Sequence, residues 1–180
     1  QRKSVMLTER DFSLLQSLYD NVVMSFPQIT KMHFESRSKP TIVNRLTRLE
    51  SGGLITKYKV PRIEITGSSK VISVVFQISR SGIWALQKRF PETEYRREAV
   101  RLRPYGIDHD LLLVDVMEAF KNKTPDGKII HGELYLVRSI ASGLKPDAIL
   151  IQPNGMSRVA LELELTVKSE KRYRELILKY

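Results

Sequence analysis

The sequence predicts an α+β fold in two parts, because both the spacing of apolar residues and the balance of charge change along the chain. Three short stretches with helical spacing come first, and two stretches that alternate like strands follow them. The second part has the predicted order α-β-β-β-α. Residues 1–103 hold 19 Lys and Arg against 9 Asp and Glu, whereas residues 104–180 hold 11 of each kind. We therefore expect the first part to bind a polyanion and the second part to have a different function.

The composition excludes several classes of protein. A chain of 180 residues with 42% hydrophobic residues can bury one good core or two small ones. The absence of cysteine excludes disulfides and thiolate metal sites, and it is compatible with the cytoplasm. No apolar run approaches the roughly 20 residues that span a bilayer. The net charge of +10 comes from basic residues in a pattern of short helices and strands, not from one long amphipathic helix with aromatic anchors. We therefore expect a cytoplasmic protein that binds nucleic acid and not a membrane.

Two helices are predicted at the start of the chain. Thr8 and Asp11 resemble a capping box, and the apolar spacing after them predicts a first helix of about 12 residues. A shorter second helix is predicted after Ser25, with Pro27 near its start, where a missing N–H costs little.

The third predicted helix, Lys39–Ser51, carries the main functional signal. Ser38 can cap its start, and Gly52 and Gly53 stop it. Its apolar positions share one face: Ile42, Leu46 and Leu49. Its polar positions share another, which can hydrogen-bond to DNA together with Lys39: Thr41, Asn44, Arg45 and Arg48. The pattern is typical of the recognition helix of a winged helix-turn-helix, and the alternative is an amphipathic helix with a solvated basic face.

A β-hairpin is predicted next, with strands at Leu54–Ile65 and Val71–Ile78 and a turn at Thr66–Ser69. Four cations lie along it, where a wing meets phosphate: Lys57, Lys59, Arg62 and Lys70. The alternative is a surface hairpin whose lysines guard its edges. Ser79 caps a further helix, in which we expect three core side chains: Ile83, Trp84 and Leu86. We predict a winged helix-turn-helix domain at residues 1–90 and a basic linker at residues 91–106.

Residues 107–180 form the second predicted domain. A largely covered helix is predicted at Asp108–Lys121. Three strands are then predicted, at Lys128–Arg138, Asp147–Gln152 and Arg158–Val167, and Ser169 caps a final helix. That helix ends in the middle of its apolar stripe, so we expect a further strand or helix beyond Tyr180.

Acidic residues of the second part form a candidate metal site. Strand periodicity places Glu162 and Glu164 on one face, and a neighbouring strand can bring Asp147 beside them. Such oxygen ligands suit Mg²⁺ or Mn²⁺, which can activate water and neutralise a phosphodiester during cleavage. The alternative is the solvated face of an antiparallel edge. The three histidines, His33, His109 and His131, lack ligand-like spacing, which argues against zinc.

The order α-β-β-β-α, with Pro146 and Asp147 opening the second strand and Glu162 in the third, resembles the PD-(D/E)xK restriction-endonuclease-like fold. The chain also resembles the bacterial replication-relaxation family and MobC-type plasmid relaxases, through LTERDFSLLQSL, NRLTRLESGGLI, IDHDLLLVDVMEAF, LKPDAILI and ALELELTVKSEKRYRELILKY. The resemblance implies a winged helix-turn-helix followed by a small nuclease-like domain. From the interrupted apolar stripe of the last helix, we expect that domain to be C-terminally truncated.

The resemblance also assigns roles in that second domain. Asp147 and Glu162 match the metal-binding acids, and Glu164 stands where the catalytic lysine normally lies. Lys168 could supply the missing ammonium, and His109 with Asp110 matches a His-Asp pair of the family. The alternative role of His109 is that of a partly exposed residue near a helix start.

Three functions compete on these grounds. The first is a protein of plasmid or mobile-element replication or mobilisation that binds an origin in double-stranded DNA, alone, as a homodimer or with other proteins of that process. The second adds nicking of DNA with Mg²⁺ or Mn²⁺. The third is a transcriptional regulator whose second domain dimerises or binds a partner or ligand without catalysis. No Gly-rich phosphate loop or GxSxG motif supports a nucleotide-driven or serine enzyme.

Overall fold

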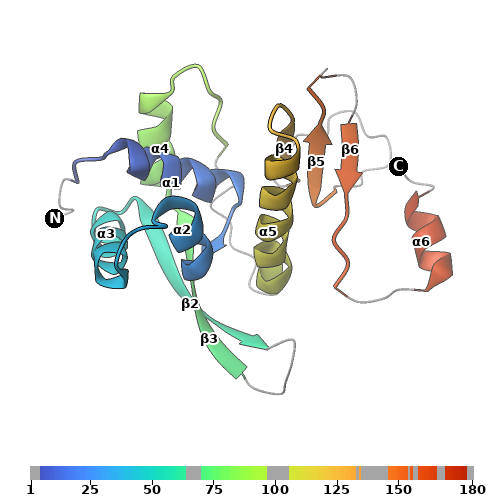
Figure 1. Ribbon diagram of the computed structural model, residues 1–180, viewed down its shortest axis with the longest axis horizontal. Helices are drawn as coiled ribbons and strands as arrows, with labels where there is room; N and C mark the ends of the chain where they lie inside the picture. Colours follow the sequence, from blue (N-terminus) through green and yellow to red (C-terminus); the bar gives the residue numbers. More distant parts are fainter. Residues whose placement is uncertain are drawn as a thin grey trace. The chain divides into compact units, whose positions relative to one another are not determined.

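The computed structural model describes residues 5–63, 70–96, 106–132, 134, 146–153, 155, 158–165 and 169–177. It has mixed helix and strand content, with two three-stranded antiparallel sheets (Figure 1). The chain divides into two compact units, Gln1–Val114 and Asp115–Tyr180. In the part of the chain that the structure describes, no helix is long and apolar enough to cross a membrane.

The helices of the first unit begin at the caps that the sequence predicts. Their bounds are α1 Glu9–Asp20, α2 Phe26–His33, α3 Lys39–Ser51 and α4 Arg80–Arg89. At the start of α1, the Thr8 N–H donates to Asp11 Oδ2 at 2.7 Å and the Asp11 N–H donates to the Thr8 hydroxyl. Ser25 and Gln28 form a second capping box at the start of α2. These reciprocal bonds satisfy amide groups that a helix start otherwise leaves unpaired. The predicted cap and length of α1 and the predicted bounds of α3 are confirmed.

The end of α3 depends on Gly53. Its φ angle is 71°, in the left-handed region that side chains with a Cβ rarely adopt. The Gly53 N–H donates to Glu50 O at 2.8 Å and the Leu54 N–H donates to Leu49 O at 2.9 Å. This pair of bonds is a Schellman motif, which ends the helix and turns the chain directly into a strand.

The first sheet is built on a long hairpin. Its strands are β1 Met24–Ser25, β2 Ile55–Ile63 and β3 Lys70–Ile78, in the order β1-β3-β2. β2 and β3 pair along their whole length, from Ile55 opposite Ile78 to Ile63 opposite Lys70. Figure 1 shows this hairpin extending beyond α2. The predicted hairpin is confirmed, while its predicted turn, Thr66–Ser69, lies outside the described residues.

The packing of α4 corrects one prediction. Ile83 and Leu86 are buried as expected, but Trp84 is 75% exposed. The cause is the close approach at Gly82, where a Cβ would lie 2.2 Å from Leu54 O. That contact turns the face around Gly82, Ile83 and Leu86 inward, and Trp84 then falls on the opposite side of the helix.

A fifth helix, α5 Ile107–Lys123, supplies its first two turns to the first unit. Ile107 and Leu111 are buried in a cluster with three residues of the first unit: Val23, Val60 and Val75. The side-chain amide of Gln28 donates to Leu111 O at 2.7 Å, which satisfies a buried polar group. The compact unit therefore ends inside α5, after Val114, while the predicted linker lies partly in undescribed residues.

The second unit has the predicted element order with shorter strands. β4 Lys128–His131, β5 Ala148–Ile151 and β6 Arg158–Leu161 pair antiparallel in that order, and α6 spans Glu170–Ile177. The prediction that one strand runs from Arg158 to Val167 is wrong. β5 begins at Ala148, whose partner is Leu161, so β6 has no β5 residue to pair with beyond that point.

We expect Gly53→Ala to lower the free energy of unfolding by about 1–2 kcal/mol, because alanine resists the left-handed conformation. Gly53→Asn should cost less, since asparagine tolerates that conformation. Urea unfolding of the two variants beside the original chain checks this. Equal stability of Gly53→Ala and the original chain would contradict the Schellman assignment.

Candidate nucleic-acid interface

The outer face of α3, defined here as Thr41, Asn44 and Arg48, is exposed to solvent. Ile42, Leu46 and Leu49 fill the opposite side of the helix and are buried, as predicted. Ser38 occupies the cap position, but its hydroxyl lies 2.9 Å from the Thr41 hydroxyl and makes no capping bond to the backbone. The start of α3 thus leaves backbone N–H groups of its first turn without a side-chain cap.

Arg45 points away from the outer face and into the molecule. Its Nε donates to Asp11 Oδ1 at 2.7 Å, and its Nη2 donates to Asp11 Oδ2 and, at 3.0 Å, to Met6 O. The Asp11 side chain is 1% exposed and that of Arg45 is 17% exposed. The bonds between Arg45 and Asp11 are bidentate, the strongest geometry for this kind of pair. The structure therefore gives Arg45 an intramolecular partner, whereas the sequence placed it with the DNA-contacting residues.

The electrostatics of this pair follow from its burial. Burial alone would raise the pKa of Asp11, but the hydrogen bonds from Arg45 and Thr8, helped by the guanidinium charge, lower it below its usual range. The hydrogen bond to Asp11 likewise raises the pKa of Arg45. Both side chains are therefore charged in the folded protein near neutral pH.

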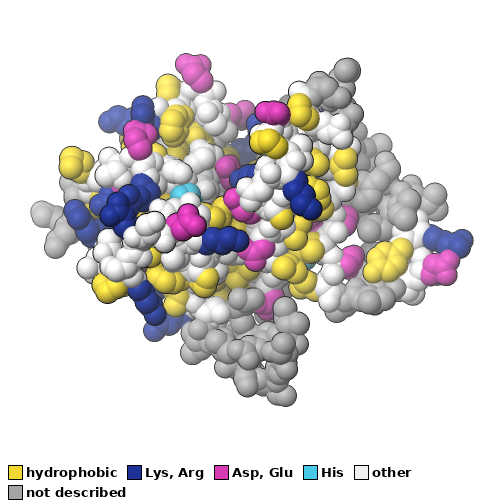
Figure 2. All heavy atoms as spheres, in the orientation of Figure 1, with side chains coloured by type: hydrophobic (Ala, Val, Ile, Leu, Met, Phe, Trp, Pro, Cys, Tyr) yellow, Lys and Arg dark blue, Asp and Glu magenta, His cyan; other side chains and the backbone are white. Residues whose placement is uncertain are grey.

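Positive charge continues on the hairpin. Lys57 and Lys59 are exposed on β2, and their strand spacing places them on the same face of the sheet. The side chains of Arg62 and Lys70 lie outside the described residues. Lys39 is exposed at the start of α3. Figure 2 shows Lys and Arg side chains gathered over the helices of the first unit.

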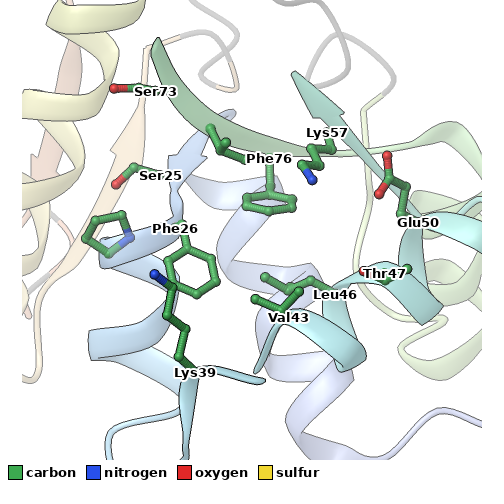
Figure 3. A pocket seen from close by; sticks show the side chains of 12 residues that line it. Ser25, Phe26, Lys39, Val43, Leu46, Thr47, Glu50, Lys57, Ser73 and Phe76 are labelled. Atoms are coloured by element: carbon green, nitrogen blue, oxygen red, sulfur yellow. The ribbon is translucent and has the colours of Figure 1, made fainter. Parts of the chain in front are cut away.

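A groove of about 430 Å³ opens between α2, α3 and the hairpin. Figure 3 shows Phe26, Phe76 and Leu46 around it, with Lys39 and Lys57 approaching from different elements. The apolar spacing along the chain did not predict this groove. Its one signal was Val43, an apolar residue outside the buried stripe of α3 that is 42% exposed and lines the groove.

In the second unit, Asp147 precedes β5 and bonds to the chain at and beyond the end of β6. Its Oδ2 accepts the Leu163 N–H at 2.7 Å, and its own N–H donates to Leu161 O at 3.0 Å. Glu162 and Glu164 are half-buried beyond the end of β6, so strand periodicity does not govern their directions. Among the described residues, no three His, Cys, Asp or Glu side chains gather closely enough to hold a metal ion. The site for Mg²⁺ or Mn²⁺ stays a prediction.

The remaining candidates lie on α5 and beyond β6. His109 Nδ1 is 3.4 Å from Asp110 Oδ1, and the Asp110 side chain is buried in the first turns of α5. Negative charge there suits the positive end of the helix dipole, which gives Asp108 and Asp110 a structural role. Lys168 lies outside the described residues.

Comparisons of the chain with protein-family models, with curated proteins and with solved structures found no match. The resemblance to the replication-relaxation family therefore stays a prediction.

We expect Arg45→Ala to lower the free energy of unfolding by about 3 kcal/mol, because it leaves the buried carboxylate of Asp11 without its partner. The exposed Arg48→Ala should change it by less than about 0.5 kcal/mol. Urea unfolding of both variants at neutral pH gives the comparison. Similar losses for the two arginines would refute the division of roles between them.

Lowering the pH should lower the free energy of unfolding, because Asp11 becomes protonated. The unfolded carboxyl has a pKa of about 3.9 and the folded one a lower pKa, so the unfolded chain takes up the proton first. The stability from this ionisation is present above about pH 4 and is lost as pH falls through the folded pKa. Asp11→Asn should flatten the decline in unfolding free energy as the pH falls below about 4. An unchanged slope would count against the charged pair.

Proposed function

We propose that the first unit is a winged helix-turn-helix that binds double-stranded DNA through α3. The observation that carries this proposal is the exposed outer face of α3, which presents an amide, a guanidinium and a hydroxyl on a helix packed firmly on its other side. With 13 residues, α3 is roughly 20 Å long and fits the major groove. The order of three helices and a hairpin supports the same proposal.

Each residue of the outer face suits a particular DNA group. Arg48 matches the O6 and N7 acceptors of guanine, and Asn44 matches the paired donor and acceptor of adenine. Thr41 can bond a base edge or a phosphate. Arg45 acts in this proposal as a positioning residue, because its bonds to Asp11 fix the rotation of α3 and hence the direction of Asn44 and Arg48.

Contacts to the DNA backbone are assigned to exposed cations beside the outer face. Lys39 begins α3, and Lys57 and Lys59 lie on β2. Lysine binds phosphate as a point charge, so these contacts add affinity for any sequence and make it sensitive to salt. For the second unit, nicking of DNA with a metal and binding of a partner without catalysis both stay predictions.

A selection from random duplexes, followed by binding titrations, tests the proposal. On the selected duplex, Asn44→Ala and Arg48→Ala should each weaken binding by about 1–3 kcal/mol, and they should cost less on a scrambled duplex. Lys59→Ala should weaken binding to both duplexes alike and reduce the slope of log K against log salt by about 1. Lys88→Ala, an exposed cation on α4, is the matched control and should change neither.

Two results would overturn this assignment. One is the absence of selection for any duplex sequence, which would remove the function. The other is an equal loss on selected and scrambled duplexes from the Asn44 and Arg48 changes, which would leave α3 without a role in recognition.

A further inference from the structure

The groove of the first unit has the size and lining of a small-molecule site. Its volume of about 430 Å³ falls within the range of ligand pockets, roughly 300–1,000 Å³. Its apolar walls come from three elements: Phe26 in α2, Val43 and Leu46 in α3, and Phe76 in β3. Such walls with a few polar groups at the edge are typical of binding sites rather than of solvated surface.

The walls favour a flat apolar body. In Figure 3 the rings of Phe26 and Phe76 both border the cavity, with Leu46 and Val43 along another side. Aromatic rings attract one another in stacked or edge-to-face arrangements beyond the gain from burial. Val43 is 42% exposed, so an occupant would remove apolar surface from water there.

The edge of the groove favours a negative charge on that body. Lys39 and Lys57 line it from α3 and β2, and neither has an ion-pair partner among the described residues. Glu50 also lines the groove, so the three charges sum to a single positive charge. A monoanion balances this charge, whereas a cation would meet two ammonium groups.

We propose that the groove binds a flat aromatic monoanion, with its ring system between Phe26 and Phe76 and its acid group at Lys39 and Lys57. The chain alone binds the anion, and no DNA is needed for this. A second consequence rests on the proposed function: the two lysines cannot serve the anion and phosphate together, so the anion weakens binding to DNA.

The probe for this site is 8-anilinonaphthalene-1-sulfonate, titrated onto the full chain. It is a monoanion with a flat naphthalene ring system, and its fluorescence rises in apolar surroundings. Phe26→Ala, which removes one wall, and Thr47→Trp, which fills the groove from an exposed position, should each weaken binding about tenfold. The double variant Lys39→Gln with Lys57→Gln should weaken it about fivefold. Near-ultraviolet circular dichroism excludes probe binding to a loosened core.

Two control variants repeat the same kinds of substitution outside the groove. Val159→Ala removes an exposed apolar side chain of the second unit, and Lys88→Gln removes an exposed charge of α4. Neither should alter the titration. Competition separates the two parts of the proposal: 1-naphthoate should displace the probe about fivefold better than the neutral 1-naphthalenemethanol.

The outcomes divide cleanly. Probe affinity unchanged by Thr47→Trp and Phe26→Ala overturns the site, and equal competition by the acid and the alcohol overturns its selectivity for anions. If the probe binds as expected but the chain binds no duplex, the groove stands and the proposed function fails. If both bind, saturating 1-naphthoate should raise the Kd for the selected duplex at least about fivefold, and an unchanged Kd refutes the competition.

Discussion

The ion pair between Asp11 and Arg45 is the interaction on which the geometry of the first unit depends. One buried carboxylate closes the capping box of α1 and receives the guanidinium of α3, which also bonds Met6 O. A buried pair of this kind adds little net stability, but the loss of one partner is costly. It therefore specifies one rotation of α3 against α1, which pure apolar packing leaves less sharply defined.

Different interactions hold the inner face and the C-terminal end of α3. Ile42, Leu46 and Leu49 remove apolar surface from water, and Gly53 turns the chain from the helix into β2 without steric strain. Because a helix and its neighbouring strand share so short a connection, the exposed residues of α3 and the lysines of β2 have fixed relative positions. The binding of double-stranded DNA proposed for α3 and β2 requires such fixed positions.

The helices of the first unit followed from the sequence because their determinants are local. Thr8, Ser25 and Gly53 act within a few residues, and apolar spacing reports one face of a helix directly. The role of Arg45 did not follow, because its partner lies 34 residues away and periodicity gives a direction without a partner. The prediction that Trp84 lies in the core was wrong for a related reason, since a backbone contact at Gly82 sets the rotation of α4. In the second unit the order of elements was predicted, but the length of β6 depends on where β5 begins.

The contact of Gln28 with α5 bears on where the first unit can be separated from the rest of the chain. Its amide closes the capping box of α2 through oxygen and bonds Leu111 O through nitrogen, while Ile107 and Leu111 complete a buried cluster. A fragment that stopped at residue 90, the predicted end of the domain, would expose Val23, Val60 and Val75 and would lose the bond from Gln28 to Leu111 O. The compact first unit thus includes the start of a helix that continues beyond it, and it ends at Val114 rather than at residue 90.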